Sequence, residues 1–463
     1  MWRKVNYTLF VFVFFLVWVS SAVHSEEPVK NDQKNYRYLK NDGTKWVAVK
    51  KSHEELNILG ETFGPDRAEA AFQNSGLFLP YQAYPIGSWP EAVAIGDVNH
   101  DGRNDVVIST SYYSDPDNDY HIHVFLQNAS GGLEPPVKYQ AGNGDSIDIG
   151  DLNNDGKADV IVTAADSIGV FLQNESGSLN PMVTYDSNHS SFTNTYKVRV
   201  GDFNNDGLLD AASIDWGTQS FDVDVYLQNI QGTLDPPTSY AVLHGGYDDL
   251  AVGDVNDDSL TDIIVMSGQL YAYQNIGILH QRSDGTFGLP VYYDIGGDEL
   301  SHGVAVGDVN DDTLQDIVLT YGGNSPNSFI GMFLQNGTGT LDPAVSTPSY
   351  DIPEPVVIGD VNVDGKNDVI VAHGGWYAMG VYLQDANGAL LPFELYPLPY
   401  ASHYNPHGLA AGDFNGDGTN DVAIADYNHG LIVLYNSKQI STVPSAFYVI
   451  PNKKGSATII YLE

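Results

Sequence analysis

The sequence contains no cysteine, so neither a disulfide nor a lipid-modified N-terminal cysteine can stabilise or anchor the chain. A secreted protein without disulfides needs a large core or another kind of cross-link. Basic residues are also scarce, with 20 lysines and arginines against 59 aspartates and glutamates. The resulting net charge of −39 excludes the basic surface that nucleic acid requires. Self-repulsion of this size is unfavourable unless cations lie among the carboxylates.

Beyond its N-terminus the sequence has no long hydrophobic run. Residues 1–25 begin with basic side chains, continue through the apolar run Leu9–Val19 and end in small residues. This order is typical of a secretory signal peptide with cleavage after Ser25, and the run is shorter than the roughly 20 residues that span a bilayer. An uncleaved anchor is the alternative. We expect a secreted protein (extracellular, cell-surface or periplasmic) with no transmembrane segment after cleavage.

One motif, which reads GDVNHDGRNDVVI in its first copy, occurs seven times. The copies begin at Gly96, Gly150, Gly201, Gly253, Gly307, Gly359 and Gly412. The interval between successive copies is therefore nearly constant. A period as regular as this indicates stacked copies of one supersecondary unit.

Each repeat unit contains four short segments rich in Val, Ile, Phe and Tyr. After the motif come an apolar run, a segment ending in Leu-Gln-Asn or a close variant, a Gly-containing turn and a segment ending in Tyr. Such segments, bounded by Gly, Asn, Asp and Pro, are typical of strands. Four antiparallel strands repeated radially form a propeller. We therefore predict an all-β fold, a seven-bladed β-propeller of four-stranded antiparallel blades over residues 72–440.

The two ends of the repeat region fit a closed ring. A strand-like segment in Phe72–Tyr84 precedes the first blade, and the last blade ends after its third strand at Asn436. We predict that the N-terminal strand completes the last blade, a device that an open solenoid would not need. Residues 26–71 are expected to form a linker or strap. Residues 441–463 are expected to be a C-terminal extension with two strand-like runs, SAFYVI and SATIIYL.

The spacing Asp-x-Asn-x-Asp-Gly-x-x-Asp suits a calcium ion. Calcium takes six to eight oxygen ligands, which side chains at loop positions 1, 3, 5 and 9 and the carbonyl at position 7 can supply. Glycine at position 6 permits a positive φ. The bidentate Glu of an EF-hand is missing, since its place falls in an apolar strand. Magnesium and soft transition metals suit this oxygen set less well. We predict five to seven Ca²⁺ ions per chain in β-hairpin loops.

The predicted ligands follow the seven copies. The side-chain ligands are Asp97, Asn99, Asp101 and Asp105; Asp151, Asn153, Asp155 and Asp159; Asp202, Asn204, Asp206 and Asp210; Asp254, Asn256, Asp258 and Asp262; Asp308, Asn310, Asp312 and Asp316; Asp360, Asn362, Asp364 and Asp368; and Asp413, Asn415, Asp417 and Asp421. The carbonyl ligands belong to Arg103, Lys157, Leu208, Leu260, Leu314, Lys366 and Thr419. Ser259 and Thr313 replace the glycine in the fourth and fifth loops. Those loops are expected either to bind calcium more weakly or to adopt a different turn.

The motif with its flanking strands resembles the FG-GAP repeat, the integrin-α-like or VCBS-type blade unit that also occurs in bacterial surface proteins and some fungal lectins. The resemblance covers roughly residues 72–440. It implies a seven-bladed propeller with calcium between the first two strands of each blade. It leaves the function open, because the family contains adhesins, lectins and enzyme accessory domains.

Aromatic and histidine side chains concentrate in the loops expected opposite the calcium loops. Trp376, Tyr377, His403 and Tyr404 are the candidate ligand-binding residues, since rings on a rigid rim suit sugars or protein partners. The alternative is that such rings pack between blades. A second candidate set lies six residues before each leading aspartate and is expected to ring the mouth of the central channel: Glu91, Asp145, Tyr196, Asp248, His302, Glu354 and His407.

Two functions follow from these features. The first is a secreted calcium-binding propeller that acts as an extracellular module for cell adhesion or for recognition of a glycan or protein. The alternative is a polysaccharide-active lyase or hydrolase that uses the carboxylates and histidines at the channel mouth. No nucleophile elbow, zinc-binding helix or phosphate loop is present, so a binding protein is favoured over an enzyme.

Overall fold

The fold was analysed in a computed structural model of the chain. It describes residues 74–110, 118–187, 194–216, 222–242, 247–267, 275–296, 300–374, 378–399 and 408–437, together with strands at 29–30, 36–41, 46–51, 447–451 and 457–461. Contacts divide the chain into two units, Met1–Ala71 and Phe72–Glu463. The described residues form strands and no helix.

The first unit contains a small antiparallel sheet. Its strands are β1 (Val29–Lys30), β2 (Tyr36–Asn41) and β3 (Trp46–Lys51), in the order β1-β2-β3. These strands were not predicted, because the segment is polar and weakly patterned.

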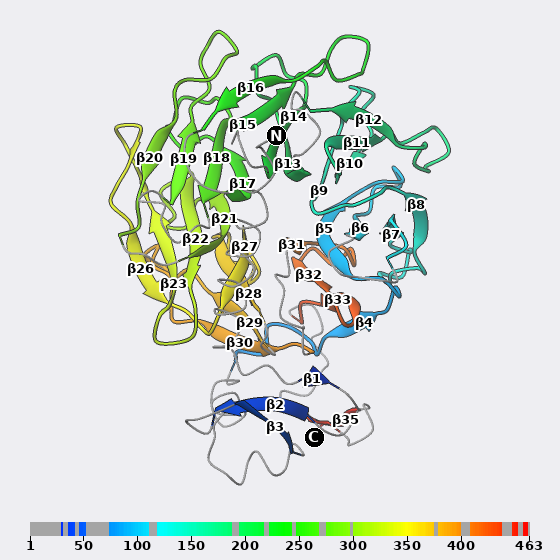
Figure 1. Ribbon diagram of the computed structural model, residues 1–463, viewed down its shortest axis with the longest axis vertical. Coiled ribbons are helices and arrows are strands. Elements are labelled where there is room, and N and C mark those ends of the chain that lie inside the picture. The colour runs from blue at the N-terminus through cyan, green and yellow to red at the C-terminus, as the bar shows by residue number, and fades with distance from the viewer. Residues whose placement is uncertain are drawn as a thin grey trace, which may run out of the picture. The chain divides into compact units, whose positions relative to one another are not determined.

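The second unit contains seven four-stranded antiparallel sheets arranged around a central axis (Figure 1). The first three are β5 (Pro90–Gly96), β6 (Asp105–Thr110), β7 (His121–Phe125) and β8 (Val137–Gln140); β9 (Ile147–Gly150), β10 (Asp159–Ala164), β11 (Ser167–Phe171) and β12 (Val183–Asp186); and β13 (Asn194–Gly201), β14 (Asp210–Trp216), β15 (Asp222–Tyr226) and β16 (Thr238–Ala241). The fourth and fifth are β17 (Tyr247–Gly253), β18 (Asp262–Ser267), β19 (Ile276–Leu279) and β20 (Val291–Tyr293); and β21 (Ser301–Gly307), β22 (Asp316–Gly322), β23 (Ser328–Phe333) and β26 (Val345–Pro348). The sixth is β27 (Pro353–Gly359), β28 (Asp368–His373), β29 (Ala378–Tyr382) and β30 (Glu394–Pro397).

The seventh sheet draws its strands from both ends of the repeat region. It consists of β31 (Leu409–Gly412), β32 (Asp421–Asp426), β33 (Gly430–Leu434) and β4 (Gln82–Tyr84), in that order. β4 pairs antiparallel with β33, and the Leu79 N–H donates to the carbonyl of Tyr435 at 2.8 Å. The first strands of neighbouring sheets also contact one another all the way around, including β31 with β5. The predicted seven-bladed β-propeller is therefore confirmed.

Two hairpins complete the described strands. β24 (Gln335–Asn336) and β25 (Thr340–Leu341) form a short ladder in the turn between β23 and β26. β34 (Phe447–Pro451) pairs antiparallel with β35 (Ala457–Tyr461), and these two strands coincide with the strand-like runs noted in the sequence.

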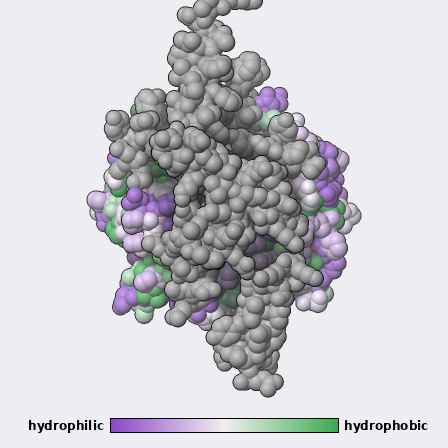
Figure 2. All heavy atoms as spheres, turned by 60° about the horizontal axis from the view of Figure 1, so that its bottom comes forward, coloured by the Kyte–Doolittle hydropathy of each residue, from purple (hydrophilic) through white to green (hydrophobic). Residues whose placement is uncertain are grey.

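The core lies between adjacent sheets, and the burial of the strands reflects this. Second and third strands are almost fully buried, because both of their faces are covered by neighbouring sheets. One cluster, which includes Val107, Ile122, Val160 and Phe171, joins the first and second sheets, and corresponding clusters occur around the ring. Most fourth strands are largely exposed at the circumference, as β8 is, whereas β30 is half buried. The described residues visible at the rim are a mixture of hydrophilic and hydrophobic ones (Figure 2).

Truncation tests whether the N-terminal strand closes the ring. Deleting residues 26–70 should leave the melting temperature of the propeller within a few degrees of the parent. Deleting residues 26–85 also removes β4 and exposes the edge of β33, so it should lower the melting temperature strongly and cause aggregation. Thermal unfolding and size-exclusion chromatography measure both effects, and equal behaviour of the two truncations would contradict closure.

Candidate functional site

The seven predicted metal loops all connect the first and second strands of a sheet. The loop from Asp97 to Asp105, for example, joins β5 to β6, and its position 9 is the first residue of β6. The apolar side chain at position 2 turns into the core between the sheets. It is at most 2 % exposed in every loop: Val98, Leu152, Phe203, Val255, Val309, Val361 and Phe414. Each loop is therefore fixed to the core at its start and at its end.

Each loop curls around its own side-chain oxygens. In the first loop the Asp97 carboxylate accepts the N–H groups of Asp101 and Gly102 at 3.0 and 2.8 Å. The Asn99 side-chain oxygen accepts the Asp101 N–H at 2.9 Å, and the Asp101 carboxylate accepts the Arg103 N–H at 3.0 Å. The other loops repeat most of these contacts, as Asp151 and Asp202 do with the residues four and five positions later. The side chains at positions 1, 3 and 5 therefore stabilise the turn of the loop by accepting its backbone N–H groups.

Two residues in each loop have a positive φ. Position 6 has φ of 83° at Gly102, and the residues that replace glycine adopt the same conformation, with 64° at Ser259 and 73° at Thr313. The fourth and fifth loops therefore keep the common turn, and a different turn is excluded. A β-branched residue in this region is strained by about 1 kcal/mol or more. The residue at position 4 also has a left-handed backbone conformation, even where it is Val363 with φ 57°. This second left-handed position was not predicted from the sequence.

The aspartate at position 9 is the most buried member of each loop. The Asp105 carboxylate is 0 % exposed and accepts the Val98 N–H at 3.2 Å and the Gln127 N–H at 2.8 Å. It therefore links the loop to the end of the third strand. Burial raises the pKa of all seven of these carboxyls. The pKa is raised to about 7 at Asp105, Asp210 and Asp421 and to about 6 at Asp159, Asp316 and Asp368. The pKa of Asp262 is raised as well. A nearby cation would favour their ionised forms.

The donor chemistry of the loops fits a hard cation. Every candidate ligand is an oxygen, and in the sixth loop the buried Asn362 Oδ1 has no hydrogen-bond partner among the described residues. Within that same part of the chain, no three histidine or acidic side chains are already gathered as a metal cluster. The carboxylates accept backbone N–H groups instead, so metal binding would have to draw on their remaining lone pairs.

The fourth blade differs from the others at a second position, directly after its third strand β19. His280 occupies the place that leucine holds in most other blades, and its Nδ1 lies 3.0 Å from the Asp262 carboxylate. The same nitrogen is 3.2 Å from the side-chain amide of Asn256. The hydrogen bond to Asp262 raises the pKa of His280. A histidine thus contacts two predicted ligands of the fourth loop.

The glutamine of the Leu-Gln-Asn segment, to which no role was assigned from the sequence, forms a hydrogen bond in several blades to the predicted metal loop of the preceding blade. Gln173 Nε2 donates to the Asp97 carbonyl of the preceding blade at 3.2 Å, and Gln228 does the same to Asp151 at 3.1 Å. The next turn packs closely too, since a Cβ at Gly177 would lie 2.6 Å from the Asn99 carbonyl oxygen. The recurrence of Leu-Gln-Asn followed by a glycine in the sequence could have indicated this contact between blades.

The five described residues of the predicted ring at the channel mouth lie outside the lining of the central cavity. Glu91 and Asp145 are nevertheless near enough to Lys197 for their charges to act on it. In four of the five blades concerned the residue lies in a β-bulge of the first strand, as Glu91 and His302 do, and a bulge redirects side chains. His302 Nε2 lies 2.8 Å from the Gly322 carbonyl oxygen, and Tyr427 Oη donates to both oxygens of Glu91 at 2.7 Å. The side chains of Asp248 and His407 lie outside the described residues.

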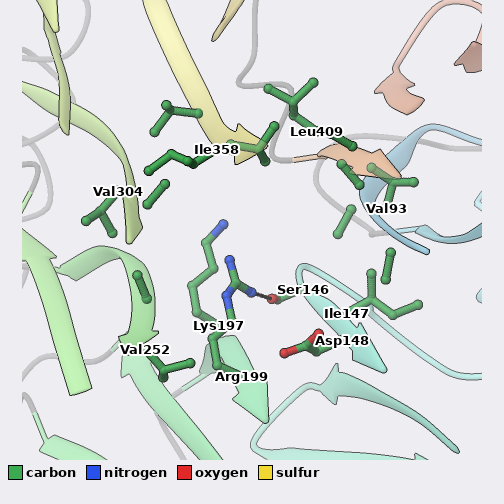
Figure 3. Close-up of a pocket in the computed structure, with 18 of the residues that line it drawn as sticks. Val93, Ser146, Ile147, Asp148, Lys197, Arg199, Val252, Val304, Ile358 and Leu409 are labelled. Carbon is green, nitrogen blue, oxygen red and sulfur yellow. Dashed lines mark hydrogen bonds between the residues drawn. The ribbon is translucent and has the colours of Figure 1, made fainter. Parts of the chain in front are cut away.

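The channel itself is lined by residues that lie two to five places before each leading aspartate. It encloses a cavity of about 400 Å³ with mostly small and aliphatic walls. Lys197 and Arg199 extend into it from β13, next to Ser146 and Asp148 of the second blade (Figure 3). These residues were not singled out in the sequence, because neither a lysine nor an arginine recurs at that place in the repeat.

The four candidate ligand-binding residues, Trp376, Tyr377, His403 and Tyr404, lie outside the described residues. Two aromatic residues at corresponding places in other blades are described, and both pack within the protein. Trp89 stacks on Tyr427 with ring centroids 5.5 Å apart, and Tyr321 stacks on Phe329 at 5.4 Å. Packing between strands and blades therefore accounts for these rings.

A family model described as FG-GAP-like repeat matches residues 97–162, 151–213, 254–319 and 360–424, together more than half of the chain. No curated protein sequence matches significantly. In the residues that the structure describes, no helix is long and apolar enough to span a bilayer.

Solved structures share the fold at low sequence identity. A lectin of Agrocybe aegerita, described as specific for non-reducing terminal N-acetylglucosamine, is 18% identical over 75% of this chain and 86% of its own, with a TM-score of 0.50. BBS1N, solved in complex with ARL6DN, is 12% identical over 79% and 99%, with a TM-score of 0.55. A Lactobacillus plantarum protein is 12% identical over 80% and 94%, with a TM-score of 0.50.

The buried Glu91 predicts a pH dependence of stability. Burial raises its pKa to about 8 from the ordinary 4.5. Between these values the unfolded chain is ionised while the folded chain holds the proton, so Glu91 destabilises the fold increasingly as pH rises towards 8. Glu91→Gln should match the parent at pH 4.5 and exceed its unfolding free energy by a few kcal/mol at pH 8.5. Denaturant unfolding measures the difference, with Glu175→Gln at an exposed site as control; a constant difference across pH would contradict a buried neutral carboxyl.

Proposed function

This chain belongs to the FG-GAP-like repeat proteins, and we propose that it is a secreted propeller that calcium stabilises and that acts as an extracellular binding module. The observation that carries the calcium proposal is the seven-fold recurrence of an oxygen-only loop around a carboxyl whose pKa is raised by burial. The ions would be held by positions 1, 3, 5, 7 and 9. A bound ion supplies positive charge to these buried and clustered carboxylates.

Calcium would act on the whole ring through the contacts between blades. Gln173 of the second blade donates to the Asp97 carbonyl of the first loop, and Gly177 packs closely against the Asn99 carbonyl. The glutamine bond recurs in the third and fourth blades. An ion that rigidifies one loop therefore also stabilises the next blade. This role is structural and leaves the opposite loops available for ligands.

The proposed ligand is a glycan or an extracellular protein. The fold is one on which a lectin and a domain that binds a protein partner are both built, and a seven-bladed scaffold presents many loops on rigid strands. Secretion is proposed from the order of basic, apolar and small side chains in residues 1–25. The enzyme alternative has less support, because the described carboxylates and the described histidine of the predicted mouth ring lie outside the lining of the central cavity.

Calcium loading tests the structural role. Native mass spectrometry should find five to seven ions per chain, and chelation should lower the melting temperature, since one site at free calcium 100 times its dissociation constant contributes about 2.7 kcal/mol. This stabilisation should shrink at pH 5, where carboxyls with a pKa of about 6 to 7 bind protons in competition with the metal. Two ions or fewer would overturn the proposal.

The fourth and fifth loops should release calcium first during a chelator titration. Ser259 and Thr313 are strained at the position that glycine holds in the other loops. Thr313→Gly is the matched variant: it should delay release from the fifth loop and leave the fourth unchanged. Equal retention in the parent and the variant would mean that the missing glycine is unimportant.

A glycan array followed by mutagenesis tests the binding role. The double substitutions Trp376→Ala with Tyr377→Ala, or His403→Ala with Tyr404→Ala, should weaken binding of any hit by about 2 kcal/mol without changing the melting temperature. Asp155→Ala should lower the melting temperature and leave affinity nearly unchanged. The reverse pattern would assign binding to the calcium-loop face, and cleavage of a hit on incubation would favour the enzyme.

A further inference from the structure

The central channel departs from the repeat symmetry at three neighbouring strands, and only one of them carries cations. Four of the seven first strands carry only small or aliphatic side chains five and three residues before the leading aspartate: Ala92 and Ala94, Gly303 and Ala305, Pro355 and Val357, and Gly408 and Ala410. The third blade instead has Lys197 and Arg199 at these places, on β13. Small side chains line one side of the channel and the two cations lie on the other. The cavity between them has a volume of about 400 Å³, a size typical of small-molecule pockets.

Lys197 is almost fully buried, and its ammonium makes no hydrogen bond to a carboxylate among the described residues. Its residue surface is 4 % exposed, and its side chain extends into the open centre of the cavity (Figure 3). The nearest described carboxylate oxygen belongs to Asp249, 3.7 Å from Nζ, and the ammonium also lies 5.4 Å from the Tyr196 ring centroid. Burial lowers the pKa of Lys197. A buried ammonium without a hydrogen-bond acceptor is unfavourable unless water or a ligand supplies one.

Arg199 presents further donors to the same space. Its Nη1 donates to the Val198 carbonyl at 2.9 Å and to Ser146 Oγ at 3.4 Å, and its Nη2 lies 3.7 Å from Asp249. A guanidinium has five N–H donors, so these contacts leave several of them unused. In Figure 3 the guanidinium and the lysine ammonium approach the same part of the cavity.

The neighbouring carboxylates are held by backbone N–H groups at the seams between blades. Asp148 accepts the N–H groups of Val200 and Ile149, both at 2.9 Å. Asp249 accepts those of Val304 at 3.0 Å and Leu250 at 2.9 Å. These bonds explain why neither carboxylate closes on the Lys197 ammonium. Glu91 and Asp145 also act on the Lys197 ammonium through their charge. Because several carboxylates already surround the two cations, the site tolerates an added monoanion better than a dianion.

We propose that the central channel binds a small monocarboxylate with a compact apolar body, its oxygens on Lys197 and Arg199 and its body against the small aliphatic wall. This site is independent of the metal loops and of the aromatic loops of the proposed function. The carboxylate supplies the acceptors that the two side chains lack, and the alanine and valine side chains remove the apolar body from water.

Calorimetric titration of the full-length protein with benzoate tests the proposal, with benzamide as the neutral isostere and inorganic phosphate as the multivalent anion. Benzoate should bind at one site per chain. Benzamide and phosphate should each bind at least tenfold more weakly. Absence of benzoate binding, or equal affinity for benzamide, would overturn the proposal.

Two variants and a matched control locate the site. Lys197→Met keeps the length of the side chain and removes its charge, and it should weaken benzoate binding at least tenfold. Ala305→Leu leaves both cations intact and fills part of the cavity, and it should have the same effect. Lys138→Met removes a lysine that pairs with Asp119 on the outer part of the first blade, and it should leave the affinity unchanged. Thermal unfolding verifies the fold of each variant, and full benzoate affinity in folded Lys197→Met or Ala305→Leu would overturn the assignment to the channel.

Discussion

A buried aspartate at the start of each second strand connects the parts of every blade. Its two oxygens accept one N–H from the metal loop and one from the end of the third strand, as Asp105 does with Val98 and Gln127. The residue that donates from the third strand then reaches across the seam with its side chain, as Gln173 does to the loop of the preceding blade. The first and sixth blades lack this last bond, since Gln127 Nε2 has no partner among the described residues and Gln384 donates to Asn367 of its own blade. The buried carboxylate therefore joins loop and blade, and unpairing it would disturb both.

This arrangement places several negatively charged side chains close together, one of them in the protein interior, where water cannot screen its charge. A carboxylate that is 0 % exposed beside two or three further aspartates is unfavourable as an anion, and its raised pKa expresses that cost. The fold can relieve the repulsion by binding protons or by binding a cation, and only the second remains effective above pH 7. The proposal of calcium follows from this electrostatic problem, together with the oxygen-only donor set.

The channel illustrates how a repeat acquires a specific site. Seven-fold repetition produces seven equivalent positions on the inner strands, and most of them hold small side chains. Lys197 and Arg199 on β13, with Ser146 and Asp148 of the second blade, give the cavity a polar side opposite its apolar wall. The two carboxylates nearby serve the seams between blades, so the cations keep donors to spare.

The sequence by itself determined the number of blades, the strands in each and the position of every predicted metal loop. The strands and loops are local features encoded within one repeat unit, and the count of seven copies gives the number of blades. Contacts between repeats were decided by the tertiary structure. The bulges that redirect Glu91 and His302, the glutamine bonds across the seams, the left-handed Val363 and the cavity at Lys197 all depend on how one blade meets the next or how a backbone bends. A linear pattern specifies which face of a strand is apolar, but it does not specify which neighbour fills the space beyond that face.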